Sequence, residues 1–203
     1  MNLQEARGEL AGRGFDYLSA SRMTIMLNNA KNAFEDAWPF PWLERTVTAA
    51  PPLLIADLKY VRMVKHVPTN DELWGLDFRQ VAQDDTDLTV RGLPGYWWLE
   101  DGPDVGAILH VWPVATDQIS VWYTGESPEL VNQIDAPQIP ARYHPIWIDY
   151  AVVQAYKDSD NFTGAQALQS DINGRMLQLI ERFETRNRQN GHFTNVRFAS
   201  EDD

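Results

Sequence analysis

The chain has 203 residues, of which 44% are hydrophobic and 23% charged, a balance typical of a folded globular protein rather than a disordered one. It contains no cysteine, which excludes disulfides and thiolate chemistry, and its 17 basic and 29 acidic residues give a net charge of −12. A chain this acidic is unsuited to gripping nucleic acid through its phosphates, although DNA could slide past it without sticking.

The N-terminal stretch predicts a short helix over residues 2–10 that glycines then interrupt. Gly8, Gly12 and Gly14 lower the helix propensity and predict a break before Phe15. No apolar core of a signal peptide and no apolar window of roughly 18 residues is present, so the expectation is a soluble protein made in the cytoplasm, with no membrane partner.

A stronger helix is predicted over residues 21–37, with Ser19 or Ser21 as its N-cap. Pro39 and Pro41 disfavour the helical conformation in the residues before them, so the helix should end at or before Trp38. The periodic apolar positions are Met23, Met26, Leu27, Ala30, Ala33, Phe34 and Ala37.

The segment WPFPW, residues 38–42, then places Trp38, Phe40 and Trp42 on an extended stretch. Such rings either form a platform for a flat ligand or pack the end of the helix against a neighbouring layer. A ligand platform needs converging polar groups, and only Glu44 and Arg45 lie nearby in the sequence. The packing interpretation is therefore favoured.

Short runs with β character, separated by Pro, Gly and Asp, fill the middle of the chain. They predict an antiparallel sheet or a small sandwich, with hairpin connections at 100–106 and 113–118. Residues 72–85 fit either a short helix or an irregular loop. The predicted strands are 46–49, 58–67, 96–100, 107–113 and 118–124.

The helical pattern returns at His144 and Pro145, and predicts one helix to Asp158 and a longer one from Phe162 to Phe183. We therefore expect an α+β protein that consists of a helical bundle with an inserted antiparallel sheet or sandwich. The expected parts are N-terminal helices over 1–45, an inserted β domain over 46–136, C-terminal helices over 137–190 that form one bundle with 1–45, and an extended arm over 191–203. The arm carries Phe193, Val196, Arg197 and Phe198, which are candidates for contact with an edge or groove of another subunit.

No motif for a phosphate loop, an activated nucleophile or a zinc site is present, so the sequence predicts no enzyme and no cofactor or metal. The four histidines, His66, His110, His144 and His192, are not at metal-ligand spacing. Two acidic clusters could in principle support a hydrolase of the peptidoglycan-cleaving kind. Both lie among turn-forming residues, which favours a loop-shaping role. The clusters are Asp84, Asp85 and Asp87, and Glu100, Asp101 and Asp104.

The predicted strands are rich in aromatic residues, which leaves a β-sandwich carbohydrate-binding module as an alternative. Trp97 and Trp98 are adjacent and must face opposite sides of the sheet, so both can be buried only if both faces are covered. Together with Trp122 they could equally meet another subunit, because tryptophan is enriched at interfaces.

Three segments resemble the head-to-tail connector, or adaptor, proteins of tailed bacteriophages. They are ASRMTIMLNNAKNAFEDAWPFPWLE (20–44), GLPGYWWLEDGPDVGAILHVWPVATDQISVWYTG (92–125) and DAPQIPARYHPIWIDYAVVQAY (135–156). The resemblance covers residues 19–183 as an order of elements.

The resemblance implies a helical bundle with an inserted β domain and no enzymatic activity. It also implies a ring of about twelve copies on the phage portal, between capsid and tail, through which double-stranded DNA passes without specific binding. The next neck or tail protein would be a further partner, and the C-terminal arm would hold the portal. In such a protein Trp38, Phe40 and Trp42 would pack the junction between the helices and the β domain.

Overall fold

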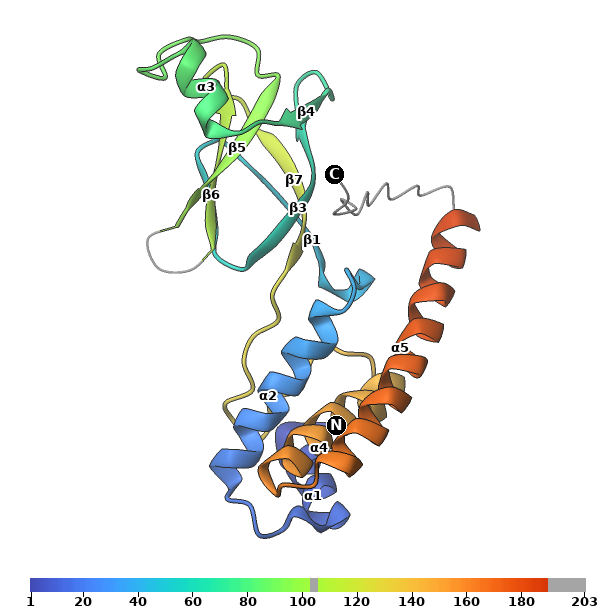
Figure 1. The fold of residues 1–203 in the computed structure, drawn as a ribbon. Coiled ribbons are helices and arrows are strands. Elements are labelled where there is room, and N and C mark those ends of the chain that lie inside the picture. The colour runs from blue at the N-terminus through green and yellow to red at the C-terminus, as the bar shows by residue number, and fades with distance from the viewer. Residues whose placement is uncertain (103–105, 190–203) are drawn as a thin grey trace. The chain divides into compact units, whose positions relative to one another are not determined.

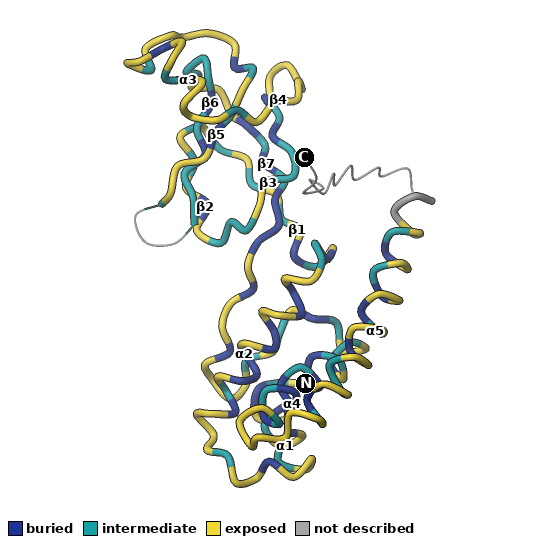
Figure 2. Tube along the Cα trace, in the orientation of Figure 1, coloured by how far each residue is buried: buried dark blue, intermediate teal, exposed yellow. Residues whose placement is uncertain are grey.

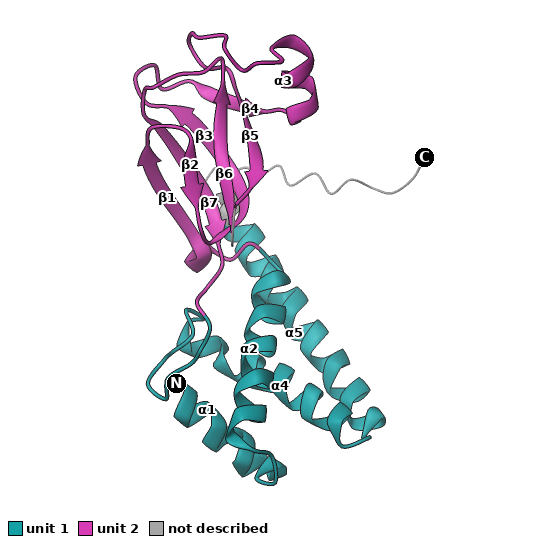
Figure 3. Cartoon of the chain, turned by 90° about the vertical axis from the view of Figure 1, so that its left-hand side faces the viewer, with its two compact units in different colours: residues 1–38, 129–203 teal, residues 39–128 magenta. Residues whose placement is uncertain are grey.

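The structure, a computed structural model, describes residues 1–102 and 106–189 (Figure 1). The chain divides into two compact units, one of residues 1–38 with 129–203 and the other of residues 39–128 (Figure 3). The first unit is helical and is built from both ends of the sequence. The second unit contains all the strands and is inserted between the helices. The predicted α+β class is confirmed.

The helical unit begins with α1 (Leu3–Leu10), which starts in a capping box. The Asn2 side chain accepts a hydrogen bond from the Glu5 N–H at 2.9 Å, and the Glu5 carboxylate accepts one from the Asn2 N–H at 3.0 Å. A π-helical turn, η1 (Ala11–Phe15), follows, in which Gly14 has a φ of +93°. This conformation favours glycine, and it produces the break that was predicted before Phe15.

Helix α2 (Ala20–Asp36) has Ser19 as its N-cap, with the Ser19 hydroxyl accepting from the Arg22 N–H at 3.2 Å. The helix ends before Trp38, as the two prolines predicted. After the 3₁₀ turn η3 (Ala141–Tyr143), α4 (His144–Asp158) and α5 (Phe162–Gln189) complete the unit. Helices α1, α2 and α4 pack against one another, and α5 packs on α4, with the buried positions on the facing sides (Figure 2).

Trp147 of α4 lies at the centre of this packing and is fully buried. Its indole N–H donates a hydrogen bond of 2.9 Å to the Leu27 carbonyl oxygen of α2. On the same helix α2, the Asn28 side-chain amide both donates to and accepts from the backbone of Leu130, at 3.0 and 2.8 Å. These bonds satisfy polar groups that would otherwise be buried without partners.

The second unit starts with the 3₁₀ turn η2 (Pro41–Leu43) and forms one seven-stranded, mostly antiparallel sheet that curls toward a barrel (Figure 1). The strand order is β1-β7-β3-β4-β5-β6-β2, and only the β4–β5 pair is parallel. The strands are β1 (Glu44–Ala49), β2 (Leu53–Ile55), β3 (Leu58–His66), β4 (Glu72–Gly75), β5 (Tyr96–Asp101), β6 (Ala107–Trp112) and β7 (Ile119–Gly125).

The inner face of this sheet holds the apolar core of the unit, which includes Val64, Leu109, Ile119 and Val121, all fully buried. Alternation along the strands directs the other side chains outward. Residues 72–85, predicted to be either a short helix or an irregular loop, contain the strand β4, which was not predicted, and then the short helix α3 (Phe78–Asp84). The short strand β2 was not predicted.

Candidate interaction surfaces

A row of three aromatic side chains crosses the outer face of strands β4, β5 and β6. Trp74 of β4 is in register with Tyr96 of β5, and Tyr96 is in register with Trp112 of β6. Residues opposite one another on neighbouring strands lie on the same face of the sheet. The Tyr96 and Trp112 ring centroids are 6.0 Å apart, and Trp74 is 70% exposed. We call these three residues the aromatic row.

Helix α3 covers the neighbouring part of the same face. The Trp98 ring stacks on His110 of the facing strand, with centroids 5.0 Å apart and an angle of 9° between the rings. Phe78 of α3 lies 6.1 Å from the Trp98 ring, and Trp98 is only 4% exposed. The helix therefore buries one pair of rings and leaves the aromatic row beside it open.

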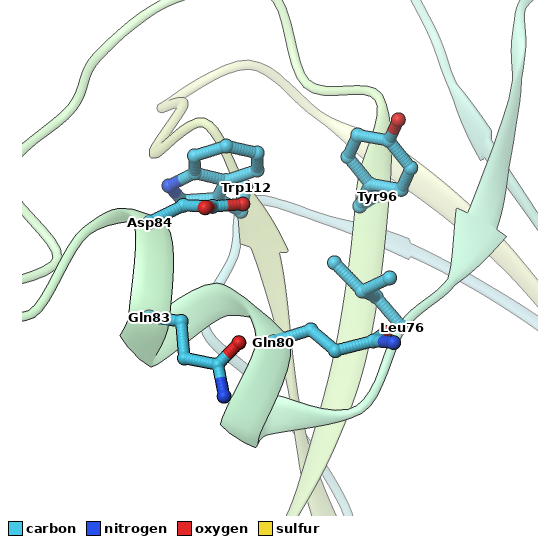
Figure 4. A pocket seen from close by; sticks show the side chains of 6 residues that line it. All are labelled: Leu76, Gln80, Gln83, Asp84, Tyr96 and Trp112. Atoms are coloured by element: carbon cyan, nitrogen blue, oxygen red, sulfur yellow. The ribbon is translucent and has the colours of Figure 1, made fainter.

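A pocket of about 330 Å³ lies where α3 meets the aromatic row (Figure 4). Gln80, Gln83 and Asp84 come from α3, and none of these three side chains forms a hydrogen bond or ion pair with another residue in the described part of the chain. The remaining lining residues are Leu76, Tyr96 and Trp112. The pocket thus combines aromatic rings with polar groups that have no partner among residues 1–102 and 106–189.

Buried Asp85 fixes one wall of this pocket. One of its carboxylate oxygens accepts hydrogen bonds from the Val90 N–H at 2.8 Å and the Trp112 indole N–H at 3.2 Å, and the other accepts from the Thr89 N–H at 3.0 Å. Burial opposes ionisation of the carboxyl group, but these hydrogen bonds outweigh it and lower the pKa of Asp85 below its ordinary value. The carboxylate therefore joins the loop after α3 to the Trp112 ring.

In the helical unit, a carboxylate links three segments. Asp149 of α4 is 7% exposed and accepts from Arg13 of η1 and from Arg175 of α5, each at 2.5 Å. Arg13 also pairs with Glu9 at 3.0 Å, and Arg175 pairs with Asp171 at 2.9 Å. Because one mostly buried charge serves two arginines that are each about one third exposed, the network holds η1, α4 and α5 in register.

His144, at the start of α4, is also buried and donates a hydrogen bond from Nε2 to the Ile139 carbonyl oxygen at 2.8 Å. Burial lowers the pKa of His144 below its ordinary value, because the charged imidazolium is poorly solvated there. Its ring also lies edge-on to Trp147, with the centroids 5.7 Å apart. His144 therefore has a structural position in the helical core.

The structure places the three WPFPW aromatics in different surroundings. Trp38 is half-buried, Phe40 is fully buried and Trp42 is half-buried. The Phe40 and Trp42 rings are stacked, with centroids 4.3 Å apart and an angle of 9°. This compact stack within the second unit contrasts with the splayed rings of a ligand platform.

The tryptophans considered for a subunit interface also differ in exposure. Trp97 is half-buried and packs against the core of the sheet, whereas Trp98 points to the outer face beneath α3. Their predicted placement on opposite faces is confirmed, and both faces are covered at this point. Trp122 is half-buried, with the Lys65 ammonium group 6.0 Å from its ring centroid.

The candidate contact residues of the C-terminal arm, Phe193, Val196, Arg197 and Phe198, lie outside the described residues. The same holds for Asp104.

The described histidines, together with Asp85 and Glu100 of the acidic clusters, make polar contacts within the chain. His66 lies 3.0 Å from the Thr69 hydroxyl, and His110 lies 3.0 Å from the Glu100 carboxylate. No group of three or more His, Asp or Glu side chains within residues 1–102 and 106–189 is arranged to hold a metal ion.

Sequence reasoning missed the pocket, although its parts were visible. The predicted strand 107–113 contains Trp112, but the sequence pattern does not single out Trp74 or the α3 side chains Gln80 and Gln83. The available signal was the pair of glutamines beside Asp84 in a segment of undecided structure. The register that brings Trp74 next to Tyr96 is a long-range property of the sheet.

No helix in the described part of the chain is long and apolar enough to span a membrane. No curated protein matches the sequence. The family model for the SU10 adaptor protein matches residues 3–196, which is nearly the whole chain, including both helical segments and the complete inserted sheet. The chain belongs to the SU10 adaptor protein family, a family of structural adaptor proteins of bacteriophages.

Proposed function

We propose that the protein is the head-to-tail adaptor of a tailed bacteriophage, which forms a ring of about twelve copies below the portal. In this position it extends the DNA channel and links the capsid to the tail. The observation that carries the proposal is the family match over residues 3–196. The protein would be made in the host cytoplasm and would be located in the neck of the virion.

The two-unit organisation supports an adaptor. Helices from both ends of the chain form one unit, and the sheet is inserted as a second unit. Two units with separate cores offer separate surfaces, one for the portal and one for the next neck or tail protein. The stacked Phe40 and Trp42, together with Trp38, are proposed to stabilise the segment where the helices lead into the sheet.

The charge supports passage of DNA without capture. The net charge of −12 per chain is multiplied by the number of copies in a ring. Each phosphate that a cationic side chain neutralised would strengthen binding of the passing duplex, and a channel lining with few cationic groups avoids such binding. Double-stranded DNA is therefore a transient occupant of the channel and is not specifically bound.

The C-terminal arm is the proposed contact with the portal or a neighbouring subunit, through Phe193, Val196, Arg197 and Phe198. Three apolar side chains and one arginine on a short alternating segment suit addition to an edge or groove of another chain. Trp97 and Trp122 are proposed contributors to contacts between subunits, because both are partly exposed.

Catalysis forms no part of the proposal. His110 and Glu100 form an exposed pair on the surface of the sheet, a contact that does not require an enzymatic role. Replacing Asp101, Asp104 or His110 by Ala should leave assembly of infectious particles intact. A peptidoglycan-cleaving activity that any one of these substitutions abolished would instead establish a hydrolase.

The experiment that tests the adaptor role removes the gene from the encoding phage and examines the lysate by electron microscopy. We expect DNA-filled heads without attached tails, and rescue by the wild-type protein supplied in trans. A chain truncated after Gln189 should fold but fail to rescue, because it lacks the arm. Normal particles made without the gene would contradict the proposed function, whereas rescue by the truncated chain would contradict only the role of the arm.

A further inference from the structure

We propose that the pocket between α3 and the aromatic row binds a neutral saccharide. Tyr96 and Trp112 of the aromatic row line the pocket, and Trp74 continues the row on the next strand, outside the pocket lining. The apolar C–H face of a sugar ring stacks on aromatic faces of this kind, while its hydroxyl groups require hydrogen bonds. Both requirements are present in the same pocket.

The hydrogen-bonding groups come from α3. Gln80 and Gln83 each carry one carbonyl acceptor and two N–H donors, and Asp84 is an acceptor. None of the three is engaged by another side chain or backbone group in the described part of the chain. Donors and acceptors side by side match a sugar hydroxyl, which both donates and accepts. A ligand made only of hydrocarbon would form no hydrogen bonds with these groups.

The site is held in position before any ligand arrives. Asp85 fixes the Trp112 ring through the indole N–H at 3.2 Å, and it holds the following loop through the N–H groups of Thr89 and Val90. Phe78 packs α3 onto Trp98 next to the pocket. A ligand therefore does not need to order the wall on which it stacks, which reduces the entropic cost of binding.

Size and charge narrow the class of ligand. The volume of about 330 Å³ lies at the lower end of the range for small-molecule sites. Neighbouring strands are about 4.8 Å apart, so the row extends over about 10 Å and can contact more than one sugar ring. The Asp84 carboxylate and the acidic chain disfavour uronic acids, sialic acids and nucleotides, which carry negative charge. A short neutral oligosaccharide therefore fits better than a single sugar.

The test uses the full chain labelled with ¹⁵N, in which the eight tryptophan indole N–H signals are followed by NMR. The probes are methyl glycosides of glucose, galactose, mannose and N-acetylglucosamine, and hexasaccharides of maltose, cellulose and chitin type. Arginine amide is a further probe, because an acidic aromatic pocket could instead receive a cationic side chain of a protein partner. The Trp147 signal, from the helical core, is the internal control for folding.

We expect at least one hexasaccharide to shift the Trp112 signal of the pocket, and the Trp74 signal where it extends along the row, with a Kd of about 1 mM or below, and its monosaccharide to bind more weakly. Gln80→Ala and Asp84→Ala should each weaken binding at least about fivefold, an effect of about 1 kcal/mol. Arg79→Ala is the matched control, because Arg79 is exposed on the same helix and does not line the pocket.

Equal binding of a monosaccharide and its hexasaccharide would still support a sugar site, with the free sugar rather than a polymer as its ligand. The proposal is overturned if no sugar shifts the Trp112 signal up to about 50 mM. It is also overturned if Gln80→Ala and Asp84→Ala bind like Arg79→Ala, or if arginine amide binds more tightly than every sugar.

Discussion

Replacing Trp147 by Phe tests how the helical unit is held together. Trp147 is fully buried, and its indole N–H donates to the Leu27 carbonyl oxygen at 2.9 Å. Loss of one hydrogen bond costs about 0.5–1.5 kcal/mol. Truncating a buried large aromatic side chain to Ala costs about 3–5 kcal/mol, and removal of only the pyrrole part should cost about a third of that, about 1–2 kcal/mol. We therefore expect a loss of about 2–3 kcal/mol.

For a chain of this length such a loss lowers Tm by about 4–12 °C. The assay is thermal unfolding followed by far-UV circular dichroism, which reports mainly on the helices. Trp74→Phe is the matched control, because Trp74 is 70% exposed and the same substitution there should change stability by less than about 0.5 kcal/mol. If Trp147→Phe lowered Tm no more than Trp74→Phe, the buried indole contact would not stabilise the fold as reasoned.

Three further predictions concern the backbone and pH. Gly106→Ala should destabilise the second unit by more than about 1 kcal/mol in a denaturant titration, because Gly106 has a φ of +82° and an added Cβ would lie 2.2 Å from a carbonyl oxygen of β2. Gly95→Ala is the control and should have a far smaller effect, because no atom lies within 4 Å of a Cβ added there. Gly174→Ala, on the exposed side of α5, should stabilise the protein by about 0.5–1 kcal/mol in urea unfolding, and a loss of stability there would show that the site is not open. Stability should fall as pH drops below about 6.5, because His144 becomes protonated in the unfolded chain while its lowered pKa keeps it neutral in the folded state. Stability should fall again below about 3.9, because Asp85, whose pKa is lowered in the folded state, becomes protonated first in the unfolded chain. Midpoints measured across pH should show both steps, and a His144→Gln variant that kept the first step would refute its assignment.

The helices could be predicted from the sequence because their signals are local. A period of 3.6 residues, a serine cap at Ser19 and the prolines after Trp38 define α2 without any tertiary contact. The same reasoning found α4 through His144 and Pro145. The strand β2 was missed because its three residues are too short to show alternation.

The candidate site could be predicted only in part because it depends on long-range register. The loop-shaping role inferred for the Asp85 cluster agrees with its hydrogen bonds to Thr89 and Val90, which are close in sequence. Its bond to Trp112 joins residues 27 positions apart and left no local signal. Opposite facing of Trp97 and Trp98 followed from strand geometry, but the cover over Trp98 required knowing that residues 78–84 form a helix.

Attachment of the protein to a portal as a ring can be tested by the mass of the purified protein, alone and mixed with portal rings of the same phage. Native mass spectrometry measures both species in one experiment. We expect a complex in which each portal ring carries a closed set of about twelve adaptor chains. Portal rings that stay unbound at adaptor concentrations well above those of the rings, or that carry only a single copy, would contradict it.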